Sequence, residues 1–232
     1  MKRSMGTFCA FLALVFLAGC GDDDNPVGVT PIFSIQQFPI KVGDWWQYEV
    51  TDTIYSFTDA VTVTRDTVMA TVVETIIYDC IGPGCPSSYT RIEFDDGENK
   101  WSYGAQIVAD TLVIAEFTII GWGTSAKSWP VINWQFPLEV GKSWQQGAEG
   151  TNQTTVLTRG EIDVPAQPFA DGYLLQWQWD GFNSISRYDI WAVPEVGIVR
   201  QYFGESCTVC SQGDFTSTWE LIDWFGKTGI SR

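Results

Sequence analysis

The chain has 232 residues, with 28 acidic and 13 basic side chains and a formal net charge of −15 at pH 7. A surface of this sign repels nucleic acid and anionic lipid headgroups, which argues against both as partners. Histidine is absent, and this removes the commonest general base and metal ligand together with every Ser-His or Cys-His nucleophile arrangement. We therefore expect a protein that is not an enzyme and that carries no cofactor.

The first residues of the chain carry the pattern of an export signal. Lys2-Arg3 is followed by an apolar core from Phe8 to Ala18, too short to span a bilayer, and small residues stand directly before Cys20. This arrangement resembles the bacterial lipoprotein signal, which implies cleavage before Cys20 and lipidation of its sulfur. We expect residues 1–19 to be a cleaved signal peptide and residues 20–35 to be a lipidated tether. The alternative is an ordinary signal peptide with a chance cysteine.

The tether also carries an acidic run, Asp22-Asp23-Asp24, directly after Cys20. Acidic residues at this place resemble sorting signals that accompany export to the cell surface in certain bacterial groups. The predicted location is a bacterial membrane, by expectation the outer membrane. The predicted domain then faces either the periplasm or the cell surface, attached to the membrane through the lipid.

Residues 36–232 are predicted to form a single all-β domain, because Val, Ile, Thr and aromatic residues alternate with turn residues and no helical periodicity is sustained. Apolar and polar side chains alternate along residues 60–78, and the alternation changes phase near Asp66. This pattern indicates two strands or one long bulged strand. Further strands are expected, in chain order, at residues 89–94, 100–103, 111–120, 154–159, 173–179, 186–191, 197–203 and 215–224. Such spacing favours a strongly curved antiparallel sheet, a half-barrel or a barrel.

A ten-residue motif occurs twice. Residues 38–47 (FPIKVGDWWQ) return as residues 136–145 (FPLEVGKSWQ), with six identical positions at an offset of 98. Each copy predicts a tight turn at Val-Gly that delivers a tryptophan into the core as a new strand begins. We interpret the domain as two similar half-sheets, about residues 38–130 and 136–226, that share one core.

Short motifs along the chain resemble a family of exported bacterial all-β proteins, often lipoproteins, whose function is uncharacterised. The family runs from a Pro-Leu-x-Val-Gly-x-x-Trp opening through a Val-Pro-Ala-Gly strand to a Gly-Val-Gly-Leu-Val strand and a final Glu-Leu strand. The corresponding segments here are residues 39–48 (PIKVGDWWQY), 164–169 (VPAQPF), 191–199 (WAVPEVGIV) and 220–222 (ELI). This sequence has Gln167 and Glu195 where the family has glycine. The resemblance implies a fold and supplies no active site.

Four further cysteines stand where hairpin tips are predicted: Cys80, Cys85, Cys207 and Cys210. An even number of cysteines outside the cytoplasm predicts disulfides, and three connectivities are open. We favour local closure, Cys80–Cys85 and Cys207–Cys210. The alternative is a four-thiolate zinc site formed where the two loops meet; we do not expect a metal site, because thiolates in an oxidising envelope are usually oxidised.

The twelve tryptophans are the richest source of candidate ligand contacts. Trp46 points to the opposite face from Trp45, and Trp191 and Trp219 share strand faces with polar residues, so we name Trp46, Trp191 and Trp219 as candidate ligand-contacting aromatics. They would stack on sugar rings or line a cleft for an apolar ligand. The alternative is that these rings fill the core of a strongly curved sheet.

Carboxylates are the remaining candidates for metal-binding or catalytic residues. The acidic stretch Asp95–Asn99 lacks the spacing of a calcium loop and is typical of a solvated hairpin turn. Pairs such as Glu49 with Asp52, or Asp95 with Glu98, could serve glycoside hydrolysis, but nothing singles out any pair and we assign no catalytic residue.

Taken together, these features predict a lipid-anchored bacterial envelope protein that acts as a non-catalytic binding or interaction module. Its expected partner is an apolar ligand such as a lipid, a glycan, or another envelope protein. Binding of nucleic acid is not expected. The alternatives are a carboxylate-based hydrolase acting on envelope polysaccharide and a structural or adhesion component of the surface.

Overall fold

A computed structural model describes residues 32–56, 60–77, 88–116, 132–146, 152–180, 184–207 and 214–225. These residues belong to one compact unit that begins at Ile32. In the described residues no helix has the length and apolar character needed to cross a membrane. Their elements are η1 (Ile35–Gln37), β1 (Trp45–Tyr55), β2 (Val61–Ile77), β3 (Ser88–Asp95), β4 (Lys100–Val108), β5 (Thr111–Glu116), β6 (Ile132–Gln135), β7 (Ser143–Gln146), β8 (Asn152–Asp163), β9 (Pro168–Asp180), β10 (Ser184–Val193), β11 (Gly197–Cys207) and β12 (Asp214–Phe225).

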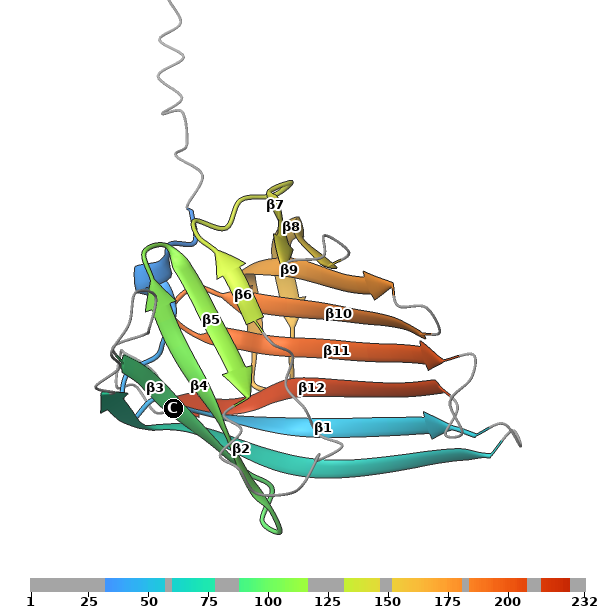
Figure 1. The fold of residues 1–232 in the computed structure, drawn as a ribbon. Helices are drawn as coiled ribbons and strands as arrows, with labels where there is room; N and C mark the ends of the chain where they lie inside the picture. Colours follow the sequence, from blue (N-terminus) through green and yellow to red (C-terminus); the bar gives the residue numbers. More distant parts are fainter. Residues whose placement is uncertain are drawn as a thin grey trace, which may run out of the picture. The chain divides into compact units, whose positions relative to one another are not determined.

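All the described strands join one 12-stranded antiparallel sheet with the order β6-β5-β4-β3-β2-β1-β12-β11-β10-β9-β8-β7. The order makes two consecutive meanders, β1 to β6 and β7 to β12, which are joined where β1 pairs with β12. The sheet curls into a nearly closed barrel, with its seam between β6 and β7 (Figure 1). The predicted all-β fold of two half-sheets around one core is therefore confirmed.

The core follows from the alternation of side chains along the strands. In β1, Trp46, Tyr48 and Val50 are buried while the residues between them are more exposed, as a half-buried strand requires. Trp219 lies at the centre of the core, with its ring centroid 5.8 Å from that of Tyr48 and 6.3 Å from that of Phe94. The core thus brings aromatic rings of β12, β1 and β3 together inside the barrel.

The repeated motif builds the same turn twice. In the first copy Gly43 has φ of 97°, its N–H donates to Val72 O at 2.9 Å, and the N–H of Val72 donates to Asp44 O at 2.9 Å. In the second copy Gly141 has φ of 88°, and Val156 makes the matching pair of hydrogen bonds, to Gly141 at 2.8 Å and to Lys142 at 2.9 Å. Each turn therefore opens a strand and ties it to the strand that follows.

The tryptophan at the end of each motif also has one role in both copies. Trp46 and Trp144 are buried, and each donates its indole N–H to a backbone carbonyl: Trp46 to Val196 at 2.6 Å and Trp144 to Asn133 at 2.5 Å. The predicted delivery of a tryptophan into the core by a Val-Gly turn is confirmed for both copies.

Alanine at either turn glycine should be destabilising, because residues with a side chain are strained at positive φ. We expect Gly43→Ala and Gly141→Ala each to lower the free energy of unfolding by about 1–2 kcal/mol, measured by urea denaturation. Gly160→Ala is the matched control, since Gly160 has no positive φ and an added Cβ would meet no atom within 4 Å. Turn variants as stable as this control would contradict the shared geometry.

The observed strands differ from the predicted ones in their bounds and in one bulge. Within the predicted stretch 60–78 the structure has one strand, β2, whose pairing with β3 shifts register between Val72 and Glu74 rather than near Asp66. The four-residue strand β6 was not among the predicted strands, because Ile132–Gln135 is too short to show an alternation. The predicted strand at residues 111–120 is described as β5 up to Glu116.

Candidate functional site

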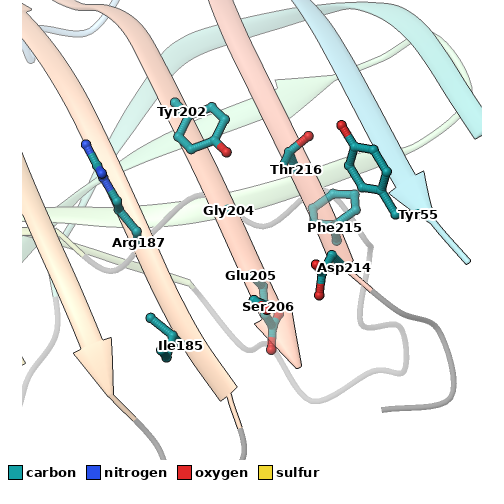
Figure 2. Close-up of a pocket in the computed structure, with 10 residues that line it drawn as sticks. All are labelled: Tyr55, Ile185, Arg187, Tyr202, Gly204, Glu205, Ser206, Asp214, Phe215 and Thr216. Carbon is teal, nitrogen blue, oxygen red and sulfur yellow. The ribbon is translucent and has the colours of Figure 1, made fainter. Parts of the chain in front are cut away.

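A depression with a volume of about 390 Å³ lies across the ends of β10, β11, β12 and β1. This volume falls near the lower end of the roughly 300–1,000 Å³ typical of ligand pockets. The four strands, spaced about 4.8 Å apart, span about 14 Å of the sheet at this depression. The lining residues, drawn in Figure 2, are Tyr55, Ile185, Arg187, Tyr202, Gly204, Glu205, Ser206, Asp214, Phe215 and Thr216.

The depression is on the outer face of the barrel. Tyr188 and Phe203 point into the barrel, where their rings stack with centroids 4.3 Å apart. Side chains alternate along a strand, so the neighbours Arg187, Tyr202 and Gly204 face outward. Figure 2 accordingly shows Arg187, Tyr202 and Thr216 on the side of the sheet turned away from the green strands behind it.

Gly204 forms the floor of the depression. It pairs with Arg187 of β10 and Thr216 of β12 in a regular ladder without a bulge. A Cβ built on Gly204 would lie 2.9 Å from the hydroxyl oxygen of Tyr202 and 3.2 Å from its Cε1. The ring of Tyr202 therefore lies down over the glycine backbone, in the space that a side chain at position 204 would occupy.

Two tyrosines expose their rings at this site. Tyr202 is 37% exposed and Tyr55 is 44% exposed, on opposite sides of Thr216 in Figure 2. Aromatic rings of this size are normally buried or paired. Two of them at the border of one depression, together with the exposed Ile185, provide an apolar contact surface beside the polar groups of the lining.

Arg187 is the basic residue of the site, and neighbouring side chains hold it in place. The Arg187 guanidinium donates to both carboxylate oxygens of Asp189, at 3.0 and 2.6 Å, and Gln176 donates to the same carboxylate at 2.9 Å. The hydrogen bond with Asp189 raises the pKa of Arg187 above its ordinary value. Arg187 is thus held in a fixed ion pair, whereas Asp214 adds a carboxylate to the lining.

The three tryptophans predicted as ligand contacts do not line this depression. Trp46 and Trp219 are 5% and 2% exposed and donate their indole N–H groups to Val196 O and Ser217 Oγ, so neither presents its ring to solvent. Trp191 is half-buried, and its ring packs beside Gly172, where an added Cβ would meet it at 3.1 Å. The structure gives all three a place in packing.

The sites predicted on cysteines fall largely outside the described residues. Cys20, Cys80, Cys85 and Cys210 are not described, and Cys207 is described only as the last residue of β11. Lipid attachment and both disulfides stay predictions. Within the described residues no three metal-ligating side chains come together.

The acidic stretch Asp95–Asn99 is a hairpin turn, as predicted. The Asp95 carboxylate accepts from Gly97 N–H at 2.8 Å, and the Asp96 carboxylate accepts from the N–H groups of Glu98 and Asn99 at 3.0 and 2.7 Å. These bonds are those of Asx-type turns. Two of the carboxylate oxygens are therefore engaged with the backbone of the turn itself.

Asp95 should titrate below the ordinary aspartate value of 3.8, since the backbone hydrogen bond from Gly97 and the contact with Lys100 lower its pKa. A lowered folded-state pKa stabilises the folded state above the unfolded value, and this contribution is lost as the pH falls through the folded value. We expect an NMR titration of Asp95 with a midpoint below 3.8, rising in Lys100→Met. A wild-type midpoint at or above 3.8 would contradict these hydrogen bonds.

The carboxylate pair Glu49 and Asp52 is separated by the sheet. Glu49 is exposed on the outer face of β1 and Asp52 is buried on the inner face, so the two cannot flank one glycosidic bond. Asp95 and Glu98 belong to the hairpin turn just described.

Gly204 is the residue whose type could mark this site in the sequence. Glycine weakens a strand interior and often marks a place where another group approaches the backbone closely. Gly204 interrupts the otherwise regular stretch that follows Gly197, and Tyr202 stands two residues before it on the same face. Arg187 and Tyr55 join this site only through the pairing of four strands.

The chain has no match among known protein families and a weak likeness to solved structures. No protein-family profile matches the chain, and no curated protein does. Among solved structures, a protein from Bacteroides fragilis described as a candidate exported protein with a YmcC-like fold matches with 14% identity and a TM-score of 0.43, covering 84% of this chain and 100% of its own. At this TM-score the likeness carries no argument about the present chain.

Proposed function

We propose that this protein is a lipid-anchored component of a bacterial envelope that binds a glycan without chemically changing it. The observation that carries the proposal is the outer depression, which combines two exposed tyrosine rings with polar groups from four strands. Sugar rings present apolar faces and hydroxyl groups together, and such a mixed surface is complementary to both. The lipoprotein-like signal ending at Cys20 supports the location.

The absence of histidine from the sequence supports a binding role over catalysis. Among the described residues, the predicted pair Glu49 and Asp52 lies on opposite faces of β1. Release of reducing sugar from a bound oligosaccharide would instead indicate the hydrolase alternative. Capture of an envelope protein with no glycan binding would favour a structural or adhesion role.

Two measurements test the proposal. The first compares wild-type protein with Cys20→Ala in fractionated bacterial cells: we expect the wild type in the membrane fraction with acylated Cys20, and the variant outside it. Digestion of intact cells with an external protease then distinguishes surface display from a periplasmic position. The second applies the purified full-length chain to an array of immobilised oligosaccharides, on which we expect saturable binding. No binding on the array contradicts the glycan proposal.

A second candidate, an apolar ligand inside the barrel, is favoured by a row of aromatic rings on the inner face. Trp177, Tyr188, Phe203 and Phe215 contact one another in turn, with centroid distances of 5.1, 4.3 and 5.9 Å. The indole nitrogen of Trp177 is buried without a hydrogen-bond partner, a feature that a polar group on a ligand would relieve. Lipid that co-purifies with wild type and is lost in Trp177→Ala would favour this candidate.

A further inference from the structure

We infer that Tyr202, held flat by the absence of a side chain at Gly204, is the stacking platform of the depression, and that its ligand is the uncharged ring of a glycan. This inference rests on the proposed function. It adds the residue on which the sugar ring lies and the charge class of the ligand.

The first step concerns why position 204 is a glycine. Gly204 lies in the interior of β11, a strand paired on both sides, where glycine is less favourable than alanine. No positive φ requires glycine there, and the ladder runs through Arg187 and Thr216 without a register shift. Conformational freedom therefore does not explain this glycine, whereas the space taken by the Tyr202 ring does.

The second step concerns the orientation of Tyr202. The Tyr202 hydroxyl, Cε1 and Cζ would all lie within 3.3 Å of an added Cβ at Gly204. With one face of the ring against the backbone and 37% of the residue exposed, the opposite face is turned to solvent. Such a ring is already held in a stacking orientation, so little conformational entropy is lost when a ligand binds to it.

The third step concerns charge. The only cation lining the depression among the described residues is Arg187, and the Asp189 carboxylate holds it in a bidentate arrangement while also accepting a hydrogen bond from Gln176. Asp214 adds a carboxylate to the outer face of the lining, and the whole chain carries −15. An acidic glycan would be repelled by this field, whereas the Tyr202 ring and the hydroxyls of Ser206 and Thr216 suit a neutral one.

The test uses the purified full-length chain on an array carrying neutral oligosaccharides beside uronic-acid and sulfated ones. The dissociation constant for the strongest neutral binder is then measured by calorimetry. Loss of the stacking contact in Tyr202→Ala should weaken binding about tenfold, while Tyr202→Phe keeps the ring and should remain within about threefold of wild type. Gly204→Ala displaces the ring and should weaken binding about as much as Tyr202→Ala.

Gly160→Ala is the matched control, because it adds the same methyl group to a strand glycine where no atom lies within 4 Å. It should bind as wild type does, and circular dichroism verifies the folding of each variant. If Gly204→Ala does not fold, the comparison of Tyr202→Ala with Tyr202→Phe still tests whether the ring contacts the glycan.

The outcomes separate the two levels of the proposal. Neutral-glycan binding that survives Tyr202→Ala overturns the platform and leaves the proposed function standing. Binding confined to uronic-acid or sulfated glycans overturns the charge class. Absence of binding to every glycan on the array overturns the proposed function and this inference with it.

Discussion

Replacing Trp219 with alanine is expected to lower the free energy of unfolding by about 3–5 kcal/mol, enough to leave a domain of ordinary stability largely unfolded on mild heating. Trp219 is 2% exposed and contacts the rings of Tyr48 and Phe94. Its removal would leave a cavity between both half-sheets, because β12 and β1 join the two meanders. Urea denaturation followed by circular dichroism measures the change.

Two variants calibrate this prediction. Trp219→Phe retains most of the ring and should cost less than the alanine variant, because the cavity is smaller. Leu157→Ala removes a side chain that is 43% exposed and should change the free energy of unfolding by less than about 0.5 kcal/mol. Equal losses in Trp219→Ala and Leu157→Ala would contradict the central position of Trp219 in the core.

The features that could be predicted from sequence are those that depend on neighbours along the chain. The alternation of Trp46, Tyr48 and Val50 sets the buried face of β1, and the Val-Gly turn precedes both Trp46 and Trp144. Period-2 patterning and glycine at positive φ are local properties. The fold class and the repeated turn therefore followed from the sequence.

The candidate site depends instead on pairing between strands. Tyr55 and Arg187 lie more than a hundred residues apart and meet at one depression only because β1, β12, β11 and β10 are consecutive in the sheet. The abundance of tryptophan drew attention to Trp46, Trp191 and Trp219, yet the exposed rings of the depression are tyrosines. Large apolar rings tend to be buried, so their number predicts a core better than a site.

Glu195 shows that residue type alone does not predict every turn conformation. The structure places Glu195 at a positive φ of 64°, the left-handed conformation that glycine favours. Its N–H donates to Gln37 O at 2.8 Å, which fixes the turn before Gly197. A residue with a side chain can thus adopt the left-handed conformation, because contacts made outside the turn hold the backbone there.

The seam between β6 and β7 lacks the backbone ladder that joins every other neighbouring pair of described strands. Trp144 of β7 reaches across it, buried and hydrogen-bonded to Asn133 O of β6. Lys142, in the turn before β7, donates to Gln135 O and Pro137 O at 2.8 and 2.9 Å. At the seam, hydrogen bonds from side chains therefore connect the strands, whereas backbone hydrogen bonds connect them elsewhere in the barrel.

Trp144→Ala should therefore cost about 3–5 kcal/mol of unfolding free energy, and Trp144→Phe, which removes the indole N–H, about 1 kcal/mol. Because a backbone ladder does not hold the seam, loss of this bond should also speed amide exchange in β6 and β7, measured by hydrogen–deuterium exchange with mass spectrometry. Trp46→Phe is the matched control, since it removes the equivalent bond of the repeated motif, to Val196 O, away from the seam. Faster exchange at β6 and β7 in both variants would mean a general loss of stability, whereas faster exchange in Trp144→Phe alone means that this tryptophan closes the barrel.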